Sequence, residues 1–126
     1  MRLAAAALAT LSLCSIAAPA MAQSSFFLGL DIAGDAERRI VRYDCGEAPG
    51  ESFDVQFINA APNFLAFVPV AGETFLFASV ISASGARYAA ANYVWWTKGP
   101  DAELYDLTLG EDAAPILSCA EHIQTP

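Results

Sequence analysis

Two short polar segments contain the residues of this chain that are best suited to chemistry. Residues 82–88 are Ser-Ala-Ser-Gly-Ala-Arg-Tyr, and residues 95–99 are Trp-Trp-Thr-Lys-Gly. The Ser84 hydroxyl can donate or accept a hydrogen bond, whereas the Lys98 ammonium only donates and carries a positive charge. Small residues around Ser84 let a loop tip approach a partner closely, and Gly99 gives the backbone the freedom that a tight turn needs. A hydroxyl and an ammonium presented together suit binding inside a cleft.

Other interpretations of these residues stay open at this point. Ser84-Gly85 is an ordinary turn dipeptide, and a lysine before a glycine is common at a solvated hairpin end. Catalysis is disfavoured because no histidine lies near a plausible nucleophile, and Asp101 with Glu103 is a common surface pairing. A glycosidase would need two carboxyls facing each other across a saccharide cleft. We therefore expect no catalytic residues and no enzymatic activity, and the main alternative is a module whose aromatic residues bind a sugar or an apolar ligand.

Short apolar runs separated by turn signals predict an all-β domain around these segments. Phe53, Val55 and Phe57 alternate with polar residues, which is typical of a strand with one solvent-facing side. A small antiparallel β-barrel of about eight strands would leave no unpaired edge, and a two-sheet sandwich is the alternative. The expected strands are residues 39–45, 52–58, 64–70, 74–80, 87–90, 92–97, 103–109 and 116–119, with a tight hairpin turn at 70–73.

Two of these expected strands are apolar on both sides. Residues 64–68 and 75–77 show no polar alternation, so they are either buried twice or covered by a partner. A closed barrel or a contact between two copies would explain this excess. We therefore consider a homodimer formed through residues 60–70 as a hypothesis.

The first 22 residues are predicted to be a cleaved secretory signal peptide. A small basic start is followed by an apolar run over residues 3–18, and residues 20–22, Ala-Met-Ala, provide the small side chains of a cleavage site. Lipoprotein anchoring through Cys14 is disfavoured because Leu13 is bulky where the lipid-processing site needs a small residue. No later segment could span a bilayer, so we expect a periplasmic protein with an extension over residues 23–40 before its domain.

Charge and cysteine content narrow the partner classes of the exported chain. Removing Arg2, the only charged residue of the leader, from a chain of formal net charge −8 leaves −9. The negative electrostatic field of a chain with this charge repels nucleic acid and steers cationic proteins toward its surface. Cys45 and Cys119 are the cysteines that remain after cleavage, and we expect them to form one disulfide in an oxidising compartment. Two thiols and the single histidine, His122, make a poor metal site, so no metal and no cofactor are expected.

The order of these motifs resembles that of a known family. Tyr43-Asp44-Cys45, the segments 82–88 and 95–99, and Ser118-Cys119 together resemble the periplasmic and membrane-bound inhibitors of c-type lysozyme. The resemblance covers residues 41–120, the expected barrel domain, and leaves residues 121–126 as a tail. It implies a small antiparallel β-barrel tied by one disulfide between the first and last strands.

The resemblance also implies a partner and a binding site. It implies that Ser84 and Lys98 enter the active-site cleft of a c-type lysozyme, a basic protein, and engage its two catalytic carboxyl groups. Gly85 and Gly99 would shape the two loops beside them. We expect Arg87 to brace the first loop through hydrogen bonds and Tyr88 to pack mainly in the core. Pro100 departs from the family pattern and would stiffen or re-aim the Lys98 loop.

Overall fold

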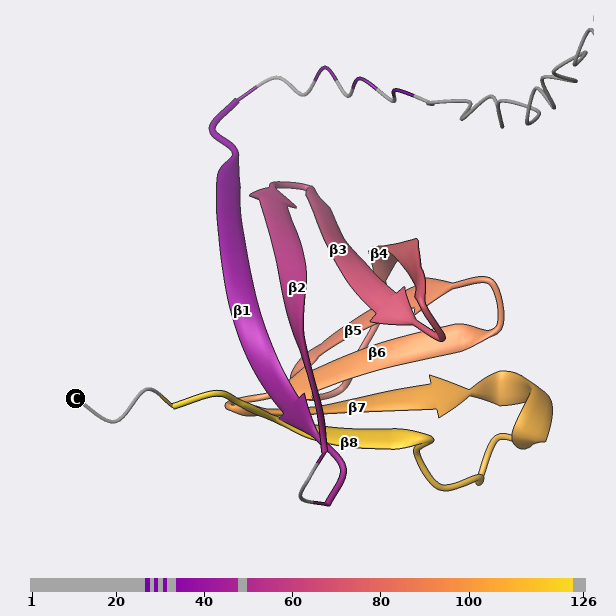
Figure 1. Cartoon of the computed structure of the whole chain (residues 1–126). Coiled ribbons are helices and arrows are strands. Elements are labelled where there is room, and N and C mark those ends of the chain that lie inside the picture. The colour runs from indigo at the N-terminus through magenta and orange to yellow at the C-terminus, as the bar shows by residue number, and fades with distance from the viewer. Residues whose placement is uncertain (1–26, 28, 30, 32–33, 48–49, 124–126) are drawn as a thin grey trace, which may run out of the picture. The chain divides into compact units, whose positions relative to one another are not determined.

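The computed structural model describes residues 27, 29, 31, 34–47 and 50–123 (Figure 1). The chain divides into two units, residues 1–30 and residues 31–126. Of the first unit only Phe27 and Gly29 are described, and Phe27 is exposed. The predicted signal peptide, its cleavage site and Cys14 lie outside the described residues. Within the described residues, no helix is long and apolar enough to cross a membrane.

The second unit contains eight antiparallel strands that close into a barrel. Each strand pairs with the next along the chain, and β8 returns to pair with β1 (Figure 1). The predicted fold class is thereby confirmed, and the two-sheet sandwich is excluded. The strands are β1 (Glu37–Cys45), β2 (Glu51–Ala60), β3 (Asn63–Val70), β4 (Glu73–Val80), β5 (Ala86–Ala90), β6 (Tyr93–Lys98), β7 (Asp101–Asp106) and β8 (Leu117–Glu121).

The strand bounds differ from the expected ones mainly at the ends. β1 begins at Glu37 and β8 ends at Glu121, so the barrel strands reach beyond residues 41–120 on both sides. The strand expected over residues 103–109 is wrong at its C-terminal end, because β7 ends at Asp106 and a 3₁₀-helix follows over Leu107–Leu109. The cause is local, since the Asp106 carboxylate accepts hydrogen bonds from the backbone and the hydroxyl of Thr108.

The barrel interior is filled by the inward side chains of alternating strand positions. Phe53, Val55 and Phe57 are all buried, as their two-residue period predicts. Trp95 is completely buried and contacts the ring of Tyr43 edge-on, with 5.2 Å between ring centroids. Aromatic side chains therefore supply much of the core of this small domain.

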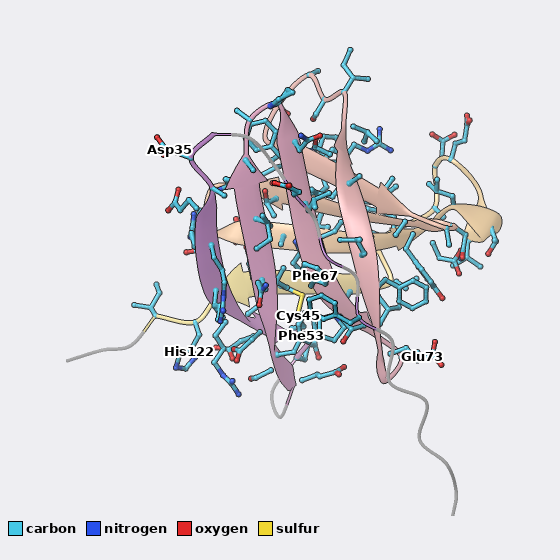
Figure 2. The ribbon with its side chains drawn as sticks, turned by 90° about the horizontal axis from the view of Figure 1, so that it is seen from above. Asp35, Cys45, Phe53, Phe67, Glu73 and His122 are labelled. Carbon is cyan, nitrogen blue, oxygen red and sulfur yellow. A yellow bond between two sulfur atoms is a disulfide. The ribbon has the colours of Figure 1, made fainter. Side chains whose placement is uncertain are left out.

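One disulfide ties the seam at which the barrel closes. Cys45 of β1 and Cys119 of β8 are register partners, and their sulfurs are bonded. Figure 2 draws this bond in yellow at the label of Cys45. The predicted pairing is confirmed.

The β3–β4 hairpin is apolar on both of its faces. Its inward side chains, such as Val68 and Phe77, are buried in the core, while Leu76 remains 39% exposed on the outside. Glu73 is the only charged residue between positions 55 and 86. Closure of the barrel explains why the inward-facing side chains of this hairpin are apolar, but it does not explain the apolar residues on the outer face. The homodimer through residues 60–70 stays a prediction.

Candidate functional site

The two polar segments meet at one end of the barrel because β5 and β6 are paired neighbours. Ala86, at the start of β5, is the register partner of Thr97, near the end of β6. The loop that enters β5 therefore lies beside the turn that leaves β6 (Figure 1). Ser84 is on that loop, and Lys98 is the last residue of β6. The antiparallel register thus brings the two segments together across 14 positions of sequence.

Gly85 permits the close approach of the two loops. Its φ is +63°, and a Cβ placed on it would overlap the carbonyl oxygen of Thr97 and lie 3.1 Å from Lys98 Cγ. Any other residue type would push the Ser84 loop away from the Lys98 turn. The glycine is therefore required by contact between the loops as well as by turn geometry.

Trp96 lies on the outer face of β6 and touches both segments. Its indole Nε1 donates a hydrogen bond of 2.9 Å to the Ser84 carbonyl oxygen. The Lys98 Nζ lies 3.8 Å from the centroid of the Trp96 ring, a cation–π distance. Trp95, its neighbour, is buried in the core. A two-residue strand period places the two tryptophans on opposite faces but does not say which one is inside.

The functional groups of Ser84 and Lys98 are both available to a partner. Ser84 is exposed, and its backbone carbonyl accepts hydrogen bonds from the Ser82 hydroxyl and the Trp96 indole. Lys98 is exposed as well. Within the described part of the chain, the Ser84 hydroxyl has no hydrogen bond and the Lys98 ammonium has no ion pair. One alcohol and one cation are thus presented to solvent at the same end of the barrel.

The turn after Lys98 is a two-residue connection that is anchored to the barrel. Lys98 and Asp101 form the closing pair, and Gly99 has a φ of +60°. The carbonyl oxygen of Pro100 accepts a 2.8 Å hydrogen bond from the backbone of Glu121 in β8. Pro100 therefore sits in a turn that β8 holds in place.

Arg87 does not brace the loop in the expected way. Among the described residues its side chain forms no hydrogen bond or ion pair, and its buried Nε lacks a partner. Its guanidinium carbon instead lies 5.3 Å from the centroid of the Trp96 ring, across the β5–β6 pair. The expectation of backbone or acidic partners for Arg87 is wrong, and its partner is an aromatic face.

Tyr88 is a core residue, as expected. It is 6% exposed and packs against Phe57, with 5.7 Å between ring centroids. Burial raises the pKa of its phenol above the ordinary value. Tyr88 therefore supports the start of β5 from inside the barrel.

The neighbouring strand β7 adds a hydrogen-bonded pair on the same outer face. The Tyr105 hydroxyl donates to a carboxylate oxygen of Glu103, and this bond, with some burial, raises the pKa of Tyr105 to about 12. Trp96 packs on Tyr105 with 6.5 Å between ring centroids. Asp106 lies at the other end of β7, so it does not flank the loops. Its carboxylate accepts hydrogen bonds from Asn92 and Thr108.

A recess of about 190 Å³ opens into the barrel at the same end. Its lining includes Thr97 and Gly99 as well as Arg39 and Glu121, which form a 3.0 Å ion pair. Burial raises the pKa of Tyr43, in its wall, to about 12. Sequence reasoning missed this recess because its lining residues come from five strands. The sequence does contain one signal of it: Arg39 and Glu121 are charged residues at inward-facing positions near the ends of their strands, which indicates a polar barrel mouth.

The described part of the chain contains no cluster of metal-ligating side chains.

Comparison with known proteins gives concordant matches. The family model described as membrane-bound lysozyme-inhibitor of c-type lysozyme matches residues 43–112. A protein of Pseudomonas aeruginosa named membrane-bound lysozyme inhibitor of C-type lysozyme is 45% identical over 95 residues, which cover 73% of each chain. A protein of the same name from Cupriavidus necator is 41% identical over 113 residues, covering 90% of this chain and 85% of that one.

A solved structure matches at the level of fold and sequence together. The crystal structure of Pseudomonas aeruginosa MliC in complex with hen egg white lysozyme has a TM-score of 0.65 and 40% identity. The match covers 79% of this chain and 98% of that one.

Proposed function

This chain belongs to the family of membrane-bound inhibitors of c-type lysozyme, and from that premise we propose that it inhibits a c-type lysozyme by inserting its Ser84 and Lys98 loops into the active-site cleft. The protein would act by occupying the cleft competitively and would have no catalytic activity of its own. Gly85 and Gly99 shape the two loops, while Arg87 and Tyr88 support the start of β5 from its two faces.

The chemistry of the two side chains matches the chemistry of the cleft. In a lysozyme of this type, one catalytic carboxyl has a raised pKa and serves as the acid, while the other stays ionised. The Ser84 hydroxyl can pair with a carboxyl in either protonation state. The Lys98 ammonium complements a carboxylate, most strongly where the cleft excludes water.

One observation carries the proposal above all others. An exposed hydroxyl and an exposed ammonium lie on touching loops, and neither has a hydrogen-bond or ion-pair partner among the described residues. Lys98 is also the only lysine of a strongly acidic chain. An unpaired cation at this position is available for a carboxylate of a partner, and the acidic remainder of the surface would speed the encounter with a basic protein.

The test is inhibition of hen egg white lysozyme acting on a bacterial cell-wall suspension. Lys98→Ala should raise the inhibition constant roughly 30-fold or more, which corresponds to about 2 kcal/mol, because a lysozyme carboxylate is left buried without a partner. Ser84→Ala should raise it about tenfold through the loss of one hydrogen bond to a charged or polarised group.

Matched controls separate the site from general effects of charge and composition. Arg42→Ala removes an exposed cation on β1, and Ser118→Ala removes an exposed hydroxyl on β8. Both controls should inhibit like the wild type when folded content is equal. Unchanged inhibition by Ser84→Ala and Lys98→Ala together would refute the site assignment, and a wild type inactive against several c-type lysozymes would refute the function.

The proposed location is the periplasm, reached through cleavage after Ala22. Its support is the basic and apolar leader of the sequence and the membrane-bound family to which the chain belongs. Mass spectrometry of the exported protein should give a chain that begins at Gln23. A lipid-modified Cys14 would instead establish membrane anchoring.

A second candidate function is suggested by the recess at the barrel mouth. The paired charges of Arg39 and Glu121 and the wall of aromatic rings would suit a small polar ligand such as a sugar. Titration with N-acetylglucosamine, followed by NMR shifts of residues that line the recess, tests this alternative. Saturable shifts in a protein that fails to inhibit lysozyme would favour it over the proposed function.

A further inference from the structure

We propose that Trp96 is the positioning residue of this inhibitor, because one indole holds the Ser84 loop and the Lys98 side chain in a fixed mutual arrangement. The inference rests on the proposed function, since it explains how the two binding groups are held before lysozyme arrives. It assigns Trp96 a role that its neighbour Trp95, buried in the core, cannot have.

The two halves of the indole act on the two loops separately. Its N–H end donates to the Ser84 carbonyl oxygen at 2.9 Å, which fixes the backbone of the loop and leaves the hydroxyl of Ser84 unused. Its ring attracts the Lys98 ammonium, whose Nζ is 3.8 Å from the ring centroid. An ammonium that rests on an aromatic ring keeps N–H donors free for an incoming carboxylate.

Trp96 is itself held by side chains from both neighbouring strands. Arg87, its register partner on β5, places its guanidinium 5.3 Å from the ring centroid. On the β7 side the ring packs against Tyr105, which is tied by a hydrogen bond to Glu103, the register partner of Trp96 on that strand. The indole is therefore fixed from both sides.

Such an arrangement lowers the entropic cost of binding. A lysine on a strand end otherwise samples many rotamers, and immobilising it at an interface weakens binding. Lys98 is already confined over the ring, so less freedom is lost when it engages a carboxylate. The cation–π attraction also strengthens when the complex excludes water, which favours the same position of the ammonium in the bound state.

The free protein offers a direct test that does not involve lysozyme. Because Lys98 is the only lysine, a protein labelled with ¹³C-lysine gives a single set of side-chain resonances. Protons held over an indole face are shifted upfield by the ring current. We expect upfield-shifted Lys98 ε-CH₂ signals in the wild type and a return toward the values of a solvated lysine in Trp96→Leu. Trp96→Phe, which retains a ring but lacks the N–H, should retain part of the shift.

The inhibition assay then asks whether Trp96 acts through Lys98. Trp96→Leu should weaken inhibition about tenfold, and Trp96→Phe by a smaller factor. In the Lys98→Ala background the same Trp96→Leu change should cost less, because only its effect through the Ser84 loop remains. Phe67→Leu, which removes a half-buried aromatic ring from β3, is the matched control and should leave inhibition unchanged. Tryptophan fluorescence, which comes from Trp95 alone in the Trp96 variants, and urea unfolding verify that each variant is folded.

Two results would overturn the inference. One is a wild-type protein whose Lys98 signals sit at solvated-lysine values. The other is a Trp96→Leu penalty of the same size in the wild-type and Lys98→Ala backgrounds, as a general structural role would produce. A wild type that fails to inhibit lysozyme would instead refute the proposed function, and the NMR result alone would then decide whether Trp96 holds Lys98.

Discussion

At the scale of single residues, Gly85 is the described glycine at which a positive φ and a close backbone contact coincide. Its positive φ and its contact with the Thr97 carbonyl are two separate reasons for a glycine at this position. Only the first reason applies to Gly72, because its φ is +83° but a Cβ added there would meet nothing within 4 Å. Comparing the two glycines separates conformational strain from contact between loops.

We expect Gly85→Ala to lower the free energy of unfolding by roughly 1–3 kcal/mol, from strain at positive φ together with displacement of the loop. Gly72→Ala should cost less, since it has the strain without the overlap. Urea unfolding measures both, and the inhibition assay at equal folded content should report weaker binding only for Gly85→Ala. Equal destabilisation with unchanged inhibition in both variants would contradict the role assigned to Gly85.

At the scale of elements, hairpin turns set the register that brings the site together. The β3–β4 connection, Ala71-Gly72, has positive φ at both residues, which is the conformation of a type I′ turn. Alanine is poorly suited to positive φ, whereas asparagine tolerates it. The turn is thus suboptimal at one position.

Ala71→Asn should therefore raise the free energy of unfolding by about 0.5–1 kcal/mol, measured by urea denaturation. Ala91, with a φ of +49°, tests the same preference in the β5–β6 turn, where only the first turn residue has a positive φ. Inhibition should stay unchanged for Ala71→Asn, because its turn is not part of the Ser84 and Lys98 loops. A loss of stability in both variants would argue against the turn assignment.

At the scale of the whole molecule, the disulfide reinforces a short seam of the barrel. β1 and β8 share three register pairs, against nine between β1 and β2. Cys45 and Cys119 form one of those three pairs, and they are 74 positions apart in sequence. A covalent link at the seam keeps the first and last strands together in the unfolded chain as well.

Reduction of this bond should lower the free energy of unfolding by roughly 4 kcal/mol in the chain-entropy model, a large share of the margin of a small domain. Urea unfolding with and without a reductant measures the effect. A Cys45→Ala, Cys119→Ala double variant should match the reduced protein and be indifferent to reductant. Equal stability of the oxidised and reduced forms would show that strand pairing alone closes the barrel.

The sequence by itself determined what depends on local patterns. The alternation of Phe53, Val55 and Phe57 predicted a strand and its buried face, and the spacing of turn signals predicted the all-β class. The two surviving cysteines predicted the disulfide. Motif resemblance led to Ser84 and Lys98 as a candidate pair. These features are local or pairwise, so a linear pattern is enough to predict them.

Only the tertiary structure decided which face of β6 is inside and what lies across the strands. A two-residue period puts Trp95 and Trp96 on opposite faces but does not say which face meets the core. The contact of Arg87 with an indole and the recess beside Thr97 both arise from side chains of separate strands. The physical reason is that barrel closure fixes strand register and curvature globally, and contacts between distant positions exist only after that register is set.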